Sequence, residues 1–384
     1  MCSEKASPRL KQLRRSYGFD EVAIVPGDVT INPDQTNVDF QIADFLFKMP
    51  IVASAMDGVV DVNMAINMGK LGGLAVLNLD GVQARYENPD EILDRIASSS
   101  NEEVTTLFQQ IYSQPIKEEF VARRVEAIKK AGVTCAVSLI PANTKRLAPV
   151  VQEAGCDILV VQSTVTSARH ISKSYKGLIF TDMVKQLKMP VLVGNCVSFT
   201  ACRELMETGI AGVFVGVGPG SACTSREVLG MGVPQITATI DCAAARDDYF
   251  EETGRYIPII TDGGIKKGGD LCKSIAAGAD AVMIGSPFAQ VKGAPGRGYH
   301  WGMANPHPAL PRGTRIKVGT TTTLEQMLLG PTSVTHGTQN LVGALRIAMG
   351  FCGAATIKEM HNAEMVIAPS IVSEGKSYQM SQGV

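Results

Sequence analysis

Residues 153–163, EAGCDILVVQS, show the unit from which the fold of this chain is predicted. A helix-like stretch ends at Ala154-Gly155, and an apolar run of strand length follows at once. Glycine just past a helix accepts the left-handed conformation that ends it. The same unit recurs as KKAGVTCAVSL (129–139), ETGIAGVFVGVG (207–218) and AAGADAVMIGS (276–286). This recurrence predicts a chain of alternating helices and strands.

Eight such apolar runs occur, and they are apolar throughout rather than alternating, which indicates strands buried on both faces. They are Pro50–Ser54, Gly73–Asn78, Val133–Ser138, Asp157–Ser163, Pro190–Asn195, Ala211–Gly216, Pro258–Asp262 and Asp280–Ser286. Parallel strands that alternate with helices form a doubly wound sheet or a (β/α)8 barrel. Eight strands favour the barrel, and no Gly-x-Gly-x-x-Gly opens a helix near the first run. We therefore predict an α/β fold, a (β/α)8 TIM barrel, as a single catalytic domain over 1–384.

The composition excludes several classes of protein. Hydrophobic residues make up 45% of the chain and charged residues only 19%, so a disordered chain is excluded. The 36 basic and 37 acidic residues give no net field for nucleic acid or an anionic membrane. The sequence has neither a signal-peptide core near its start nor an apolar run long enough for a membrane helix. The nine cysteines are scattered without a Cys-x-x-Cys pair, which predicts reduced thiols in the cytoplasm.

Three stretches exceed what a plain barrel needs. Residues 1–49 form an N-terminal extension, Cys223–Tyr256 follows the sixth strand, and Gly293–Asn340 follows the eighth as a flap or insertion region. Long loops at the carboxyl ends of barrel strands usually build or cover the active site. We expect the site there.

The segment Gly216–Arg226 is the most unusual of these loops. Three glycines and a proline are followed by a thiol, two hydroxyls and a guanidinium. A cysteine on such a loop can be an exposed nucleophile, so we single out Cys223 and interpret the other cysteines as structural. Asp262-Gly263-Gly264 and Gly285-Ser286 follow the last two strands, where glycine N–H groups commonly bind a phosphate.

Several motifs, in this order, resemble those of the IMP dehydrogenase/GMP reductase family. They are Ile51–Asp61 (IVASAMDGVVD), Val193–Asn195, the loop GVGPGSACTSREVLGMGVPQ (216–235), Thr261–Ile265, Met283–Ser286 and Leu345–Gly353. The resemblance covers nearly the whole chain.

The resemblance implies a reaction. Cys223 would attack C2 of a purine nucleotide, a hydride would pass to NAD⁺, and water would release XMP from the remaining thioimidate. Ser225 stands where the family has a threonine hydroxyl that assists proton transfer. Arg312 is our candidate for activating the water, because the family's Arg-Tyr pair is missing from the flap. The alternative is that Arg312 contacts a phosphate or lies at the surface.

The resemblance also implies the binding residues. The nucleotide would be held by Ser54, Met56, Asn195, Ser221, Asp262, Gly264, Gly285, Ser286, His300, Gly302, Met303 and Ala304. NAD would contact Gln162, Ser163, Gly216 and Gly218. Potassium would bind the backbone carbonyls of Gly218, Gly220 and Cys223, because oxygen donors suit a hard cation. Gln162 replaces an aspartate that grips the NAD ribose in the family.

The resemblance leaves alternatives open. Only Leu79–Gly132 separates the second and third strands, so the regulatory CBS pair that many family members insert there is absent. The leading function is oxidation of IMP by NAD⁺. The first alternative is GMP reduction by NADPH to IMP and ammonia, and the second is a non-catalytic protein that binds purine nucleotides. The resemblance also suggests a homotetramer, or an octamer built from two.

Overall fold

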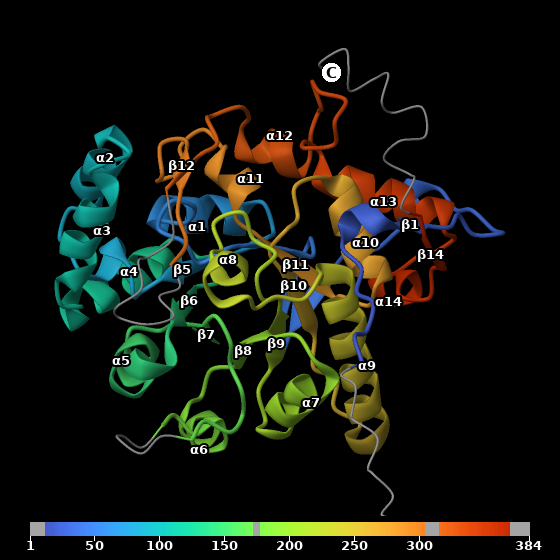
Figure 1. The fold of residues 1–384 in the computed structure, drawn as a ribbon, viewed down its shortest axis with the longest axis horizontal. Coiled ribbons are helices and arrows are strands. Elements are labelled where there is room, and N and C mark those ends of the chain that lie inside the picture. The colour runs from blue at the N-terminus through green and yellow to red at the C-terminus, as the bar shows by residue number, and fades with distance from the viewer. Residues whose placement is uncertain (1–11, 172–176, 304–314, 369–384) are drawn as a thin grey trace, which may run out of the picture.

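The computed structural model describes residues 12–171, 177–303 and 315–368, and within them eight parallel strands close into a barrel (Figure 1). The barrel strands are β4 (Ile51–Ala53), β5 (Leu74–Asn78), β6 (Ala136–Leu139), β7 (Ile158–Gln162), β8 (Val191–Cys196), β9 (Gly212–Val215), β10 (Ile259–Asp262) and β11 (Ala281–Ile284). They follow one another around the barrel, and β11 closes it by pairing with β4. Each of the eight predicted strands is present, so the predicted (β/α)8 TIM barrel is confirmed.

Helices connect the strands and surround the barrel (Figure 1). They are α1 (Val62–Lys70), α4 (Glu118–Lys130), α5 (Pro141–Glu153), α6 (Phe180–Gln186), α7 (Phe199–Glu207), α9 (Gln235–Thr253), α10 (Gly268–Ala276) and α13 (Leu341–Phe351). The predicted glycines after helices all take positive φ, from 73° at Gly132 to 104° at Gly278. This conformation lets each helix end and the chain turn at once into the next strand.

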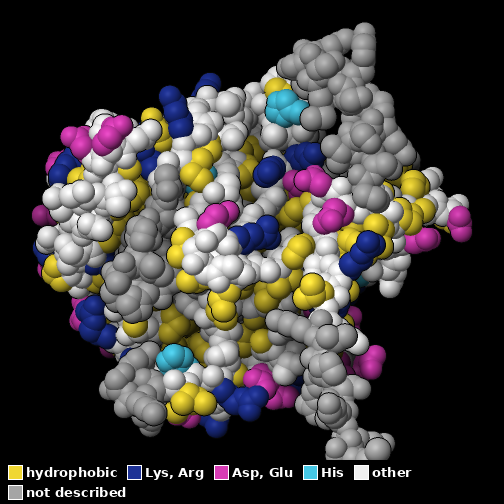
Figure 2. Space-filling model, viewed as in Figure 1, with side chains coloured by type: hydrophobic (Ala, Val, Ile, Leu, Met, Phe, Trp, Pro, Cys, Tyr) yellow, Lys and Arg dark blue, Asp and Glu magenta, His cyan; other side chains and the backbone are white. Residues whose placement is uncertain are grey.

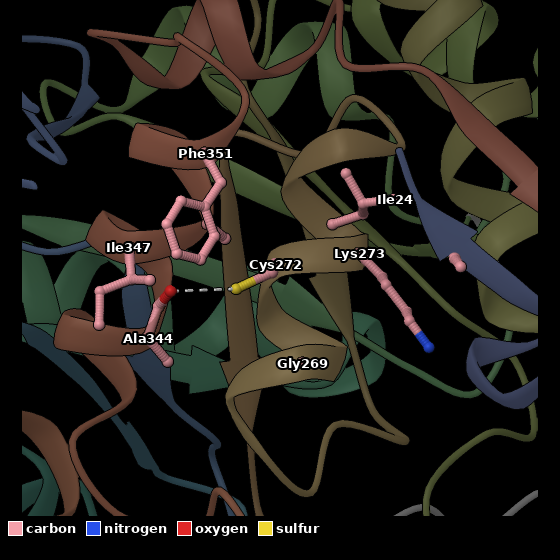
Figure 3. Close-up of a pocket in the computed structure, with 9 residues that line it drawn as sticks. Ile24, Gly269, Cys272, Lys273, Ala344, Ile347 and Phe351 are labelled. Atoms are coloured by element: carbon pink, nitrogen blue, oxygen red, sulfur yellow. Dashed lines mark hydrogen bonds between the residues drawn. The ribbon is translucent and has the colours of Figure 1, made fainter. Parts of the chain in front are cut away.

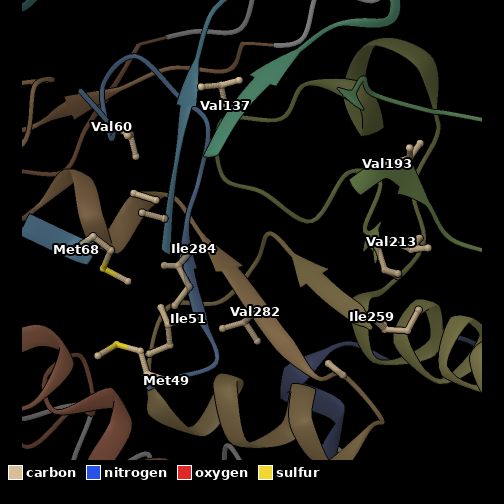
Figure 4. Packing of buried hydrophobic residues seen from close by; sticks show 14 of the residues in the cluster. Met49, Ile51, Val60, Met68, Val137, Val193, Val213, Ile259, Val282 and Ile284 are labelled. Carbon is tan, nitrogen blue, oxygen red and sulfur yellow. The ribbon is translucent and has the colours of Figure 1, made fainter. Parts of the chain in front are cut away.

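The uninterrupted apolar character of the strands has a simple cause. Alternate side chains point into the barrel and outward to the helices. On β11, Ala281 and Met283 join the interior cluster, whereas Val282 and Ile284 join the layer beneath the helices. Figure 4 shows part of that outer layer, with Ile51, Val282 and Ile284 close together. Both faces of each strand are therefore buried.

Part of the predicted N-terminal extension belongs to the barrel core. The hairpin of β2 (Phe40–Ile42) and β3 (Phe45–Phe47) buries Phe40, Ile42 and Phe47 in the interior cluster. Farther out, β1 (Val22–Ile24) pairs antiparallel with β14 (Met365–Ile367). The two ends of the described chain are thereby joined.

The two long stretches contain secondary structure. Much of Cys223–Tyr256 is helical, because α8 (Ser225–Leu229) and the 19-residue α9 lie within it. The buried face of α9 consists mainly of alanine, threonine and cysteine, so its sequence lacks a stripe of large apolar side chains. Gly293–Asn340 contains the short ribbon β12 (Tyr299–His300) and β13 (Ile316–Lys317), followed by α12 (Leu324–Leu328).

Two general features of the surface bear on partners. On the face drawn in Figure 2, basic and acidic side chains are interspersed rather than gathered by sign. Among the helices of the described residues, none is long and apolar enough to cross a bilayer.

Candidate active site

The loop after β9 brings the predicted nucleophile to the carboxyl ends of the strands. The Sγ of Cys223 donates a hydrogen bond to the Ser225 hydroxyl at 3.3 Å. Cys223 is partly exposed, whereas Ser225 is buried at the start of α8. Six other cysteines are buried and Cys352 is partly buried, so the described thiols separate as predicted except at Cys352. A solvent-accessible thiol therefore lies beside a fixed hydroxyl.

Close approaches of backbone hold this loop in place. A Cβ at Gly216 would lie 2.2 Å from the Asp262 carbonyl oxygen, and one at Gly264 would lie 3.2 Å from Cβ of Pro219. Gly216 has φ 150° and Gly264 has φ 82°, conformations that other residues rarely adopt. The glycines thus let the nucleophile loop lie directly on the turn after β10.

Asp262, at the end of β10, is held by two amides. Its Oδ2 accepts hydrogen bonds from Nδ2 of Asn195 and Nε2 of Gln162, both at 2.8 Å. Asn195 also donates to the Gly216 carbonyl at 2.8 Å, which links this group to the nucleophile loop. The other carboxylate oxygen, Oδ1, accepts no hydrogen bond from the described residues, so it is available to a ligand's hydroxyl groups.

The charge on Asp262 depends on two opposing effects. Burial raises the pKa of this carboxyl to about 6, while the hydrogen bonds from Asn195 and Gln162 act to lower it. The carboxylate is therefore mostly ionised at neutral pH, and a fall in pH to about 6 is enough to protonate half of it. An ionised carboxylate accepts hydrogen bonds from hydroxyl donors more strongly than a neutral acid does.

Two hydroxyls and an imidazole form a second polar group. The Ser221 and Ser286 hydroxyl oxygens are 2.6 Å apart, and the Ser286 hydroxyl is 2.9 Å from Nε2 of His300. Burial lowers the pKa of His300 to about 4, so its ring is neutral at pH 7. Its Nδ1 has no partner among the described residues. The group joins the nucleophile loop to the start of α11 (Ser286–Ala289), where an anion would meet hydroxyl donors.

The remaining predicted nucleotide residues lie around these groups. The Ser54 N–H donates to the Ile284 carbonyl at 2.9 Å, which fixes the loop after β4 against β11. The Met56 sulfur would lie 3.0 Å from a Cβ at Gly285, and a Cβ at Gly302 would lie 2.8 Å from the Ala222 carbonyl oxygen. Met303 contacts Tyr112. Ala304 and Arg312 lie outside the described residues, so their roles stay predictions.

The predicted cofactor residues are already engaged within the protein. Gln162 uses both amide hydrogens, on Asp262 and on Oδ1 of Asn195 at 2.7 Å. The Ser163 hydroxyl donates to the Val165 carbonyl at 2.9 Å. Gln162 can therefore offer a dinucleotide only its carbonyl oxygen. A carbonyl oxygen can accept a ribose hydroxyl as the family's aspartate would, so the residues present are compatible with NAD.

The predicted potassium ligands lie on the nucleophile loop. Gly218 has φ 85°, and the Gly220 carbonyl accepts the Cys223 N–H at 3.0 Å. A carbonyl oxygen with one hydrogen bond keeps a second lone pair for a cation. The donor set of neutral oxygens thus fits a hard monovalent ion, and the site stays a prediction.

Sequence reasoning gave no role to several residues that the structure brings to the site. Gln235 donates to the carbonyls of Val215 at 2.6 Å and Asp262 at 3.3 Å, and so supports the nucleophile loop from behind. Asp57 and Tyr112 are hydrogen-bonded at 2.8 Å. Asp57 lies within the Ile51–Asp61 motif, but no local pattern marks Tyr112.

Two features lie outside the strand-end site. The sulfurs of Cys196, Cys202 and Cys242 lie within 4.8 Å of one another in the core, although their sequence spacing showed no metal motif. A surface hollow of about 440 Å³ opens between α10 and α13. Figure 3 shows it with Ile347 and Phe351 on one side, and with the Cys272 thiol donating to the Ala344 carbonyl at 3.6 Å. None of the predicted site residues lines it.

Comparison with known proteins gives a consistent result. The model of the IMP dehydrogenase / GMP reductase domain matches residues 16–304. An uncharacterized oxidoreductase of Mycolicibacterium smegmatis is 38% identical over 92% of this chain and 97% of its own. An inosine-5'-monophosphate dehydrogenase of Cryptosporidium parvum is 28% identical over 91% of each chain. The crystal structure of an IMP dehydrogenase/GMP reductase-like protein from Corynebacterium glutamicum superposes with a TM-score of 0.88 at 33% identity, covering 93% of this chain and 95% of that one.

Proposed function

The chain belongs to the IMP dehydrogenase/GMP reductase family, and we propose that it oxidises IMP to XMP through a covalent bond between Cys223 and C2 of the purine. The observation that carries the proposal is the pairing of the accessible Cys223 thiol with the Ser225 hydroxyl at the mouth of the barrel. A protein that only binds nucleotides has no need of this pair.

The covalent step is assigned to the Cys223 thiolate. Its sulfur adds to C2 of IMP, and the hydrogen on C2 then leaves with its electron pair as a hydride. NAD⁺ supplies the hydride acceptor. Water then adds to C2 of the thioimidate, the C–S bond breaks, and XMP, a proton and the thiolate are released. The Ser225 hydroxyl, 3.3 Å from Sγ, is placed to pass the proton during these steps.

The nucleotide would bind across the strand ends. The hydroxyls of Ser221 and Ser286 would donate to the phosphate, and the free oxygen of Asp262 would accept from the ribose hydroxyls. Both contacts lie at the nucleophile loop, because Ser221 is part of the loop and Asp262 packs against it at Gly216. The purine would then lie near Cys223, between the Met56 and Gly302 segments.

Hydrolysis needs a group that orients or activates water. Arg312 is our candidate on sequence grounds, because a guanidinium stays charged and its N–H groups can orient a water or hydroxide. The acceptor oxygen of Gln162 and the backbone of Gly216 and Gly218 would hold the dinucleotide, and potassium would bind the loop carbonyls.

GMP reduction is the alternative activity within the family. It would use the same cysteine adduct, with hydride delivered from NADPH and ammonia as the leaving group. Ammonia must take up a proton as it leaves, and residue 312 is an arginine rather than an acid. Because arginine does not readily give up a proton, this residue favours the dehydrogenase.

The deciding experiment follows the absorbance of reduced nicotinamide with purified protein, potassium, IMP and NAD⁺. We expect a rise for the wild type and none for Cys223→Ala. A flat wild-type trace together with consumption of NADPH in the presence of GMP would establish the reductase instead. Binding of IMP without turnover in either direction, unchanged in Cys223→Ala, would indicate a non-catalytic nucleotide-binding protein.

A further inference from the structure

A helical hairpin between β5 and α4 has a hydrophobic cluster of its own. The hairpin consists of α2 (Pro89–Ser98) and α3 (Val104–Ser113), which form a separate pair at the edge of the molecule in Figure 1. Its cluster is joined from far along the chain by Trp301, which is fully buried, and by the partly buried Tyr299 and Met303. The Trp301 ring lies 5.4 Å from the ring of Phe108 on α3. The hairpin thus anchors the segment that carries Gly302 and Met303.

A buried chain of hydrogen bonds runs from Trp301 across the hairpin to the loop after β4. The Trp301 indole N–H donates to the Tyr112 hydroxyl at 2.6 Å, and that hydroxyl donates to Oδ2 of Asp57 at 2.8 Å. The indole N–H can only donate and an ionised carboxylate can only accept. The Tyr112 hydroxyl therefore accepts from the indole and donates to Asp57 at 2.8 Å, with the Met303 sulfur as a more distant second acceptor at 3.8 Å.

Both ends of this chain lead into the predicted nucleotide site. Asp57 follows Met56, whose sulfur lies against the backbone of Gly285. Trp301 precedes Gly302, whose backbone lies against the Ala222 carbonyl, next to the nucleophile Cys223. Tyr112 therefore links the Met56–Asp57 and Gly302–Met303 segments, although it lies on a helix that contributes no predicted binding residue.

Two arginines fasten the β12–β13 ribbon to the same hairpin. Arg297, before β12, forms ion pairs with Asp90 and Asp94 on α2, each at 2.9 Å. Arg315, before β13, donates to the Ile96 and Ala97 carbonyls at the end of α2 and lies over the Tyr299 ring. The base of the flap region is thus held from both of its strands.

We propose that Tyr112 is a positioning residue that fixes the distance between the Met56–Asp57 and Gly302–Met303 segments, and so shapes the nucleotide site of the proposed dehydrogenase. The assignment to a nucleotide rests on the proposed function. The bridge itself is a property of the free protein, so it can be tested with and without nucleotide.

The test without nucleotide uses the fluorescence of Trp301, the one tryptophan of the chain. Tyr112→Phe removes the acceptor of its indole N–H and keeps the ring. We expect red-shifted emission and increased quenching by acrylamide, because water can then reach the indole N–H in place of the phenol oxygen. Tyr256→Phe is the matched control, because it also removes a tyrosine hydroxyl that donates to a buried aspartate, Asp280, just before β11. The control should leave both readouts unchanged.

The test with nucleotide compares kinetic constants for IMP. Loss of one positioning hydrogen bond should raise KM about fivefold to tenfold in Tyr112→Phe and leave kcat within about twofold. Trp301→Phe removes the same hydrogen bond from its other end. The rise in KM of the double variant should therefore be smaller than the product of the two single rises. Tyr256→Phe should have the same KM and kcat as the wild type when both are assayed well below the melting temperature of the variant.

The outcomes separate the two hypotheses. Tyr112→Phe that matches Tyr256→Phe in fluorescence and in KM would overturn the positioning role. The positioning role would also be overturned if the rises in KM caused by Tyr112→Phe and Trp301→Phe simply multiply in the double variant. A wild type that neither binds nor oxidises IMP would reject the proposed function, and the fluorescence comparison would then decide the bridge by itself.

Discussion

The hydroxyl of Ser286 lies 2.9 Å from Nε2 of His300, whose side chain lies almost wholly inside the protein with an exposure of 1%. The serine therefore has a neutral imidazole as its partner, so the stability of this part of the protein depends on whether that ring is protonated.

Histidine 300 should make the folded protein less stable in acid. Its pKa is about 4 in the folded state against about 6.5 when unfolded, so the unfolded chain binds the proton more readily. The neutral His300 ring contributes its full share to the free energy of unfolding above pH 6.5. That contribution is lost as the pH falls toward 4, by up to about 3 kcal/mol. Denaturant unfolding should show a smaller acid loss for His300→Gln, which keeps a hydrogen-bonding group for Ser286. Equal losses in both proteins would contradict the assignment.

Asp262 should set the acidic limb of the pH profile of kcat/KM. With a pKa of about 6, the carboxyl becomes neutral below that pH and accepts ribose hydroxyls less well. Asn195→Ala removes a donor to the ionised form and should move the limb upward by about one pH unit. Thr239→Val is a suitable control, because it removes the hydrogen bond to Thr261, the residue before Asp262. A limb that stays in place in Asn195→Ala would assign it to another group.

Ser225 should matter for turnover rather than for binding. Its hydroxyl is buried and reaches Sγ of Cys223, so Ser225→Ala should lower kcat about a hundredfold, the usual size of a proton-transfer contribution. The dissociation constant of IMP, measured by calorimetry in the Cys223→Ala background to prevent reaction, should change less than about threefold. Loss of affinity without loss of kcat would make Ser225 a binding residue.

Gly216 should tolerate no side chain. Gly216→Ala places a Cβ 2.2 Å from the Asp262 carbonyl, so the loop or the β10 turn must move. Gly254→Ala provides a matched control, because Gly254 also has positive φ, 70°, yet has open space around its Cβ position. We expect Gly254→Ala to cost about 1 kcal/mol of stability and keep activity, and Gly216→Ala to cost more and abolish it. Thermal melts and the nicotinamide assay measure both effects.

The strands were predictable because both of their faces are buried. Runs such as Ile158–Gln162 and Ala281–Ile284 are apolar at every buried position, and the glycines before them mark where each helix stops. The site could be placed on the strand ends for the same reason, because parallel strands of a barrel end on one side. This rule placed Asp262 and Ser286 at the strand ends, whereas their roles as nucleotide ligands were predicted from the family resemblance.

What could not be predicted depends on contacts between distant residues. Helix α9 buries small side chains, so its sequence carries no clear apolar stripe. Tyr112 gains its role only because Trp301 and Asp57 meet it, and those residues lie far away in the chain. The engagement of Gln162 by Asp262 was equally hidden, because a side chain's hydrogen-bond partners are set by tertiary packing.

The pairing of β1 with β14 has a consequence for the order in which this protein folds. Phe19, just before β1, would lie 3.4 Å from a Cβ at Gly264, so the early chain contacts the turn beneath the nucleophile loop. β1 itself finds its partner at Met365–Ile367, after every barrel strand has been synthesised. A contact between such distant parts of the chain is slow to form, because the loop it closes is long. During synthesis, the barrel can therefore assemble from its own strands before β1 pairs with β14, and the contact of the early chain with the turn beneath the nucleophile loop is completed last.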